Sequence, residues 1–434
     1  MRTRTLIFAL LAATLGGRAQ EAPRTEPIDL ATVLRLAGAD GIDIELAEAR
    51  WREARAAADS STLALFPTLS PGVGYRNHTG TAQNFGGPVS DVDKASLNAG
   101  ATLSLTLELG EAVYRRLAAQ QMAQAAEHGL AAQRRQTILQ ASLTYFDLAK
   151  SQQTVALLED SVRSAREYHG QVGRAVQAGL AFKGDEIRAF GQVSRLELRL
   201  RQALDQRRGE AARLAQLLRL KITENLVPAD DRPLALVLVD KDRKLDEYVQ
   251  GALARRPEIK EAGSLQAAAQ HQNDGARYGP LYPTLGAQVF AGGLGGSNGS
   301  AQRDFGKSTD TSVTLSWKIG AGGLFDNARS AATEARLRQT QLMETKTRDE
   351  IIRQVVEAQT HVIFLGQQLK IAEEAIRSSE QGYRLALARK EFAVGIVLEA
   401  LQSQQDLIQA KLDYAGTVGE LNKAQVRLKA AAGE

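Results

Sequence analysis

The segment Ala64-Leu65-Phe66-Pro67-Thr68-Leu69 decides the fold, because Pro280-Leu281-Tyr282-Pro283-Thr284-Leu285 repeats it 216 residues later. The alternating segment that ends with Leu103–Gly110 returns at an offset of 210 as Val313–Gly320. An offset this constant predicts two tandem copies of one structural unit. We therefore expect a fold with internal pseudo-symmetry.

The repeat extends beyond these segments. Glu159–Ser164 returns as Glu373–Ser378 at an offset of 214. The sequence therefore predicts a first repeat over residues 20–242 and a second over residues 243–434. Residues 1–19 are expected to be a secretory signal peptide, because Arg2 and Arg4 precede an apolar run that ends near small residues.

The composition narrows the classes of function. The chain has no cysteine, which excludes disulfides, thiolate metal sites and a lipid anchor on cysteine. The formal net charge is +4, and removing Arg2, Arg4 and Arg18 with the signal peptide leaves +1. Basic and acidic residues are interleaved, so we expect no nucleic-acid binding. No segment has the roughly 18 to 20 apolar residues that a membrane-spanning helix requires.

Each copy shows the same predicted order of helices and strands. Pro67 and Pro283 end the first helix of each copy, because proline lacks an amide hydrogen and disfavours helical geometry before it. Two extended segments and two long helices follow. The predicted helices are 29–65, 111–178, 185–219, 245–279, 326–392 and 398–431, and the predicted strands are 69–76, 96–109, 285–292 and 311–319.

The last predicted strand alternates clearly: Val313, Leu315, Trp317 and Ile319 point one way, and polar residues point the other. Such a strand fits a half-buried sandwich or the wall of an outer-membrane barrel. In a barrel, the aromatic residues at the ends of the strands would lie at the membrane interface. The candidates are Phe66, Tyr282 and Trp317.

The long helices carry a coiled-coil pattern. In the second copy Val355, Val362, Leu369, Ile376 and Tyr383 recur every seven residues, with mostly small residues three positions on. Joined by tight turns, such helices are expected to fold back as antiparallel hairpins. The predicted fold class is therefore α+β but mostly α.

Four strands cannot close a barrel within one chain, because bacterial barrels begin at eight strands. An open sheet in lipid would leave two edges of unpaired backbone groups, each costing roughly several kcal/mol. Strands in a membrane therefore require an oligomer. Two chains would supply eight strands and three would supply twelve, and sequence physics leaves both open.

Taken together, the duplicated Phe/Tyr-Pro-Thr-Leu junction, the two strands per repeat, the helical hairpins and the closing stretch Gln404–Gln425 resemble the TolC-type outer-membrane efflux proteins. The resemblance implies a homotrimer with a 12-stranded outer-membrane barrel and a periplasmic α-helical tunnel. It implies a passive exit duct in a Gram-negative bacterium, for a tripartite efflux or type I secretion system. The implied partners are a periplasmic adaptor (membrane fusion) protein and an inner-membrane pump of RND or ABC type.

The resemblance also implies a periplasmic gate at the turns between the long helices. The segment Gly179–Asp185 fits such a turn, which makes Gly179 and Asp185 candidates, and the shorter second turn offers Gly395 and Glu399. Glycine at a helix C-terminus and an acid in the next first turn are also ordinary helix capping. Both roles are compatible.

We find no catalytic constellation, and we expect no enzyme, no cofactor and no metal site. Gly295–Gly299 matches the Gly-x-Ser-x-Gly nucleophile motif, but it lies in a glycine-rich segment without the strand-to-helix turn that the motif requires. The alternative to a conduit is a soluble periplasmic coiled-coil scaffold whose strands form a small sandwich or a dimeric sheet.

Overall fold

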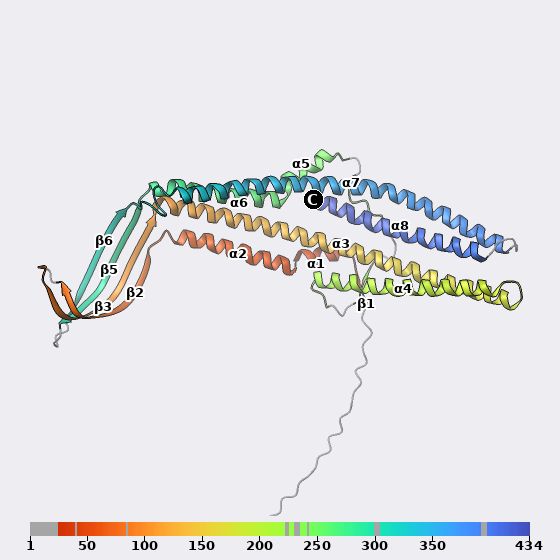
Figure 1. The fold of residues 1–434 in the computed structure, drawn as a ribbon, viewed down its shortest axis with the longest axis horizontal. Helices are drawn as coiled ribbons and strands as arrows, with labels where there is room; N and C mark the ends of the chain where they lie inside the picture. The colour runs from red at the N-terminus through yellow and green to blue at the C-terminus, as the bar shows by residue number, and fades with distance from the viewer. Residues whose placement is uncertain are drawn as a thin grey trace, which may run out of the picture. The chain divides into compact units, whose positions relative to one another are not determined.

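The computed structural model describes residues 25–39, 41–83, 86–221, 225–229, 235–240, 243–298, 304–391 and 397–434 (Figure 1). The expected signal peptide and Gly395 lie outside these residues. The described part is mostly helical with a few strands, as the predicted fold class requires.

Its elements follow one another in a simple order. In chain order they are β1 (Thr25–Ile28), α1 (Leu30–Ala39), α2 (Ile42–Leu63), β2 (Thr68–Gln83), β3 (Val89–Glu108), α3 (Leu109–Gln177), α4 (Lys183–Leu217), β4 (Asn225–Pro228), α5 (Leu245–Arg255), α6 (Pro257–Tyr278), η1 (Gly279–Leu281), β5 (Thr284–Asn298), β6 (Asp304–Ser316), α7 (Asn327–Glu391) and α8 (Val397–Ala431).

The chain divides into two compact units, and each takes segments from both halves of the sequence. One unit comprises residues up to 33, 144–233 and 375–419. It holds α4, the adjoining parts of α3, α7 and α8, and the short parallel pair of β1 and β4. The other unit comprises residues 34–143, 234–374 and 420–434, and it contains the larger sheet.

This larger sheet is fully antiparallel, with the strand order β2-β3-β5-β6. Figure 1 shows the four strands side by side. The register places Thr68 opposite Ser104, Glu108 opposite Thr284, and Thr284 opposite Ser316. The helix-side ends of β3, β5 and β6 are therefore level, whereas β2 begins opposite Ser104, four residues before β3 ends at Glu108. The strands β2 and β6 form the two edges of the sheet.

The four strands are longer than the sequence predicts, with 16, 20, 15 and 13 residues. The glycine- and serine-rich stretches that were expected to be loops mostly extend the two hairpins instead. Backbone pairing explains this difference, because a hairpin continues as long as its ladder is satisfied, whatever the side chains. The last strand ends at Ser316 rather than at residue 319, because a tight turn with Gly320 at φ 97° follows it.

Two predicted single helices, 29–65 and 245–279, are each broken into two. The first is interrupted before α2, where Gly41 has an extended backbone with ψ 132°. The second is interrupted at Arg256, which has ψ 129° and precedes Pro257. Proline pushes the residue before it into an extended conformation, so this break can be predicted from the sequence.

Coiled-coil packing holds the helices of each unit together. In the unit with α4, Leu158, Val162, Leu196 and Ile408 form a buried seam with small alanines between them. In the unit with the sheet, Val355 is fully buried in a cluster of residues from the segment around α5, from α7 and from α8. Alternating large and small side chains allow the close approach that knobs-into-holes packing requires.

Candidate functional site

The register of the larger sheet collects apolar side chains on one face. Leu69 lies opposite Leu103, Leu103 opposite Val289, and Leu285 opposite Leu315. Residues directly opposite one another in neighbouring strands project from the same face of the sheet, so the apolar side chains of all four strands lie on one face. The larger members of this apolar face are Leu69, Val73, Tyr75, Leu97, Leu103, Leu105, Leu107, Leu285, Val289, Phe305, Val313 and Leu315.

The apolar face is exposed in the single chain, which is unusual for a water-soluble protein. Val73 is 75% exposed and Val313 is 72% exposed. From the pair Leu285–Leu315 to the pair Gly295–Phe305 the strands run for ten residues, roughly 33 Å. At the tilt of barrel strands this corresponds to a height of about 25 Å, the thickness of the apolar band of outer-membrane barrels.

The opposite face of the same sheet is polar. It carries serine, threonine, asparagine and glutamine together with glycines, and we call it the polar face. Its members include Ser70, Gly72, Gly74, Arg76, Ser96, Asn98, Gly100, Thr102, Ser104, Gln288, Gly292, Ser308, Asp310, Ser312 and Thr314, with Val92, Phe290 and Leu294 as the larger apolar exceptions.

The three aromatic candidates all lie at the helix end of the sheet. Phe66 and Tyr282 each precede a strand by two residues, and Trp317 directly follows β6. All three are exposed, and the indole Nε1 of Trp317 donates a hydrogen bond to the carbonyl of Leu281 at 3.4 Å. Sequence reasoning missed Tyr75 and Phe305, which mark the far end of the apolar face. Continuing the alternation past Val73 would have found Tyr75.

The junctions between strands and helices are tied together by charge. The carboxylate of Glu111 accepts hydrogen bonds from Arg329 at 2.6 and 3.4 Å and forms an ion pair with Arg115 at 3.2 Å. Burial alone would raise the pKa of Glu111, but the hydrogen bonds and charges of Arg329 and Arg115 hold it below its ordinary value. This network joins the first turns of α3 and α7.

The turn from α3 to α4 contains the gate candidates Gly179 and Asp185. Gly179 has φ 73°, a conformation that residues with a Cβ adopt only with strain. The amide of Leu180 donates to the carbonyl of Ala175 at 2.8 Å, and that of Gly179 donates to Val176 at 3.0 Å. This arrangement is a Schellman motif, so the glycine has a structural role in ending the helix.

Both acidic gate candidates are paired with an arginine. Asp185, in the first turn of α4, accepts a hydrogen bond from Arg188 at 3.1 Å, and its side chain is only 17% exposed. Glu399, in the first turn of α8, accepts one from Arg389 of α7 at 2.9 Å. Helix capping and these ion pairs are sufficient to explain why an acidic residue stands at each of the two positions.

Four helices pack together close to this turn. Tyr168 and Val172 of α3 lie in a buried cluster with Ala189 of α4, Ala386 of α7 and Leu401 of α8. Burial, then the neighbouring Tyr383 and Asp185, raise the pKa of Tyr168 to about 12. Asp185 is therefore held close to the core that fixes the two hairpins to each other.

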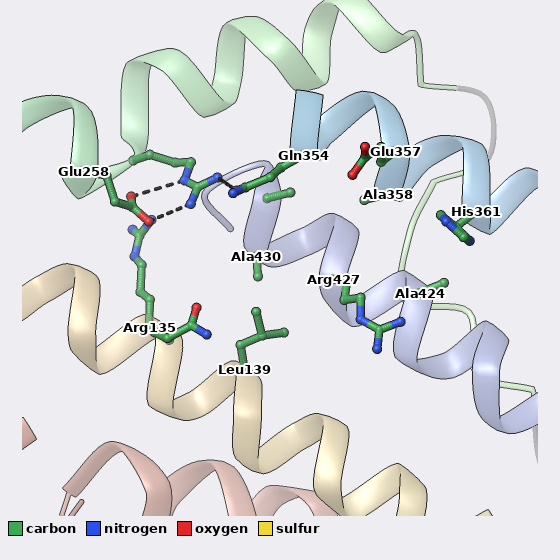
Figure 2. Close-up of a pocket in the computed structure, with 13 residues that line it drawn as sticks. Arg135, Leu139, Glu258, Gln354, Glu357, Ala358, His361, Ala424, Arg427 and Ala430 are labelled. Atoms are coloured by element: carbon green, nitrogen blue, oxygen red, sulfur yellow. Dashed lines mark hydrogen bonds and ion pairs between the residues drawn. The ribbon is translucent and has the colours of Figure 1, made fainter. Parts of the chain in front are cut away.

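A separate cavity of about 350 Å³ lies among α3, α6, α7 and α8 (Figure 2). Arg256 makes a two-point hydrogen bond with Glu258 at 2.6 and 3.2 Å and a third bond to Gln354 at 2.7 Å. Burial raises the pKa of Glu258, but Arg256, assisted by Arg135, brings it below the ordinary value. Figure 2 shows Arg135 reaching from α3 toward Glu258. The acids here are satisfied ion-pair partners.

The structure also places the features that were weighed for metal binding and catalysis. They contain no group of three His, Cys, Asp or Glu side chains that could hold a metal ion. Ser297, the serine of the Gly-x-Ser-x-Gly match, lies in β5 and pairs with Ala95 of β3, so it does not stand on a strand-to-helix turn. None of the helices described is long and apolar enough to cross a bilayer.

An exposed apolar strand face, a polar face behind it and paired helical hairpins define the class of outer-membrane channels with long helical extensions. Comparison with known proteins agrees: residues 33–218 and 248–434 match the outer membrane efflux protein family. The chain belongs to this family and is an outer-membrane protein. The resemblance to TolC-type proteins is thereby confirmed.

Individual relatives point the same way. Protein CyaE of Bordetella pertussis is 27% identical over 305 residues, which span 67% of this chain and 60% of the relative's own length. A membrane protein from Pseudomonas aeruginosa has a similar structure, with a TM-score of 0.82, 21% identity and 93% of each chain covered. The outer membrane channel CmeC of Campylobacter jejuni gives a TM-score of 0.81 at 16% identity, covering 99% of this chain and 94% of CmeC.

We expect the variant Glu111→Gln to lower stability at neutral pH by about 1–2 kcal/mol, because Arg329 loses its charged partner. Since the folded-state pKa lies below the ordinary 4.5, the contribution is complete above that pH and is lost as the pH falls through the folded-state pKa. Thermal unfolding in detergent at pH 7 and at successively lower pH measures this difference.

The control is Glu357→Gln, which breaks an ion pair with Arg353 in which both side chains are more than half exposed. Exposed pairs contribute little, so this variant should unfold close to the wild type at each pH. A Glu111→Gln deficit that stays constant as the pH is lowered would contradict the assignment.

Proposed function

We propose that the protein is a homotrimeric, passive conduit across the outer membrane, with a 12-stranded barrel in lipid and a helical tunnel in the periplasm. Family membership and the structures of the outer-membrane channels that it resembles support this proposal. We expect the partner that supplies the energy to select the transported substrate.

The observation that carries the proposal is the pair of open sheet edges. Within the described residues the outer edges of β2 and β6 have no partner strand. Because the four strands alternate in direction, β2 and β6 run antiparallel to each other. The β6 edge of one copy can therefore continue into the β2 edge of the next copy as an ordinary antiparallel ladder.

The number of copies follows from the lumen. Eight strands from two copies make an interior that side chains fill, whereas twelve leave room for a channel. The glycines, serines and threonines of the polar face are small, which suits a wall that lines water. These considerations favour three copies.

The two halves of the chain are proposed to be tandem repeats, as the constant sequence offsets suggest. Each half supplies one β-hairpin and one hairpin of long helices: β2, β3, α3 and α4 in the first, and β5, β6, α7 and α8 in the second. In a trimer, six such hairpins would form the wall and six the tunnel.

The proposed partners are a periplasmic adaptor protein and an inner-membrane pump of the RND or ABC type. The α3–α4 turn presents Leu180 and Phe182, which are 83% and 82% exposed. Apolar side chains with this exposure at a helical tip are suited to contact another protein. The exposed apolar face of the sheet disfavours the soluble scaffold, because a water-soluble protein would bury it.

The conduit is tested by reconstitution. The wild-type protein purified in detergent should insert into a planar bilayer and give discrete, ohmic current steps, because a closed barrel encloses water. Membranes that receive detergent alone are the control. A protein that binds the bilayer without conducting would contradict the proposal.

The gate role of Asp185 is tested in the same bilayers. Three carboxylates near one axis would favour cations at the entrance, so Asp185→Ala should raise the unit conductance or weaken cation selectivity. The matched control is Asp160→Ala, which removes an exposed, arginine-paired acid of α3 remote from the turn. Unchanged conductance and unchanged selectivity in Asp185→Ala would eliminate the gate role.

A further inference from the structure

A bulky aromatic residue lies on the polar face of the sheet, where small residues otherwise predominate. Phe290 of β5 is flanked by Thr102 of β3 and Asp310 of β6. Its side chain is partly buried, whereas Leu294, another large apolar residue of this face, is 51% exposed. The wall itself must therefore cover much of the Phe290 ring.

The ring is accommodated by a pair of glycines. Gly292 follows Phe290 by two residues on the same face, and Gly100 lies directly opposite Gly292 in β3. A methyl group added to Gly100 would stand 2.9 Å from Cε2 of Phe290, and one added to Gly292 would stand 2.9 Å from Cζ. The methyl groups would also stand 2.5 Å from the carbonyl oxygen of Ala291 and 2.3 Å from that of Ala99, respectively. Glycine at both positions is therefore required by the neighbouring backbone as well as by the ring. The ring lies across the two glycine Cα atoms.

The two strands also come unusually close at this pair. A methyl group on either glycine would lie 2.7 Å from the Cα of the other. Gly72 of β2 extends the same row beyond Gly100, and a methyl group there would meet nothing within 4 Å. Glycine rows of this kind let a sheet bend sharply, and an aromatic ring laid over them replaces the missing side-chain packing.

We propose that Phe290 sets the free cross-section of the conduit at this level, with Gly100 and Gly292 as positioning residues that hold its ring flat against the wall. This inference rests on the proposed function, because the polar face lines a lumen only when the wall closes into a barrel. In a trimer three rings stand at one level. Lying flat they leave the lumen open, and raised from the wall they narrow it.

The test is a double-mutant cycle in planar bilayers. Gly292→Ala should displace the ring toward the lumen and lower the unit conductance. The double variant Phe290→Ala with Gly292→Ala removes the displaced ring and should conduct better than Gly292→Ala alone. The part of the conductance that is not recovered reports the shift of β3 that the methyl group forces on the carbonyl of Ala99, 2.3 Å away. This rescue distinguishes an effect that acts through the ring from a general distortion of the sheet.

The matched control is Gly286→Ala, on the same strand and the same face. Its methyl group would meet Cβ of Thr314 at 3.8 Å, an ordinary contact, so its conductance should equal that of the wild type. Phe290→Trp provides a second route if Gly292→Ala does not assemble. Its larger ring overhangs the glycine pair and should lower the conductance, whereas Phe290→Leu should not.

The possible outcomes distinguish a failure of this inference from a failure of the proposed function. A wild type that does not conduct overturns the proposed function and this inference together. A conducting wild type overturns the inference alone when Phe290→Trp conducts like it, or when the double variant conducts as poorly as Gly292→Ala.

Discussion

Backbone hydrogen bonding at the outer edges of β2 and β6 is the constraint on which the rest of the structure depends. In water the two edges could be solvated, but in the proposed barrel the exposed apolar face lies in lipid, where unpaired amides and carbonyls each cost roughly several kcal/mol. On the proposed function, the single chain is therefore an incomplete wall that further copies complete. Apolar residues along α7, such as Ile363 and Ile371, are likewise exposed in the single chain.

Close backbone approach is the second recurring device, and glycine makes it possible in two places. At the start of α3, a methyl group on Gly110 would stand 2.6 Å from the carbonyl oxygen of Gly279, so helix and junction can meet only without a side chain. In the wall, Gly100 and Gly292 bring two strands together beneath Phe290. One contact joins the sheet to the helices, and the other shapes the surface that faces the proposed lumen.

Much of this architecture could be predicted from local signals. Pro67 and Pro283 place the starts of β2 and β5 within one residue of the expected positions, because proline acts on its immediate neighbours. The far ends of the strands could not be predicted in this way, since they depend on pairing across hairpins and their composition is typical of loops. The break before Pro257 could also be predicted from the proline, although a single helix over residues 245–279 was expected there. The proximity of Asp185 to Tyr168, and of Phe290 to Gly100, depends on packing between elements distant in sequence.

The central claim is that three incomplete walls close into one barrel, and the most direct measurement is the mass of the protein extracted from the outer membrane, corrected for bound detergent. The account predicts a particle of three chains and no stable monomer, with a mass about three times that of the chain, which is 46.8 kDa before the signal peptide is removed. A monomer that remains folded without detergent would contradict it, because the edges of β2 and β6 and the apolar face would then be tolerated in water.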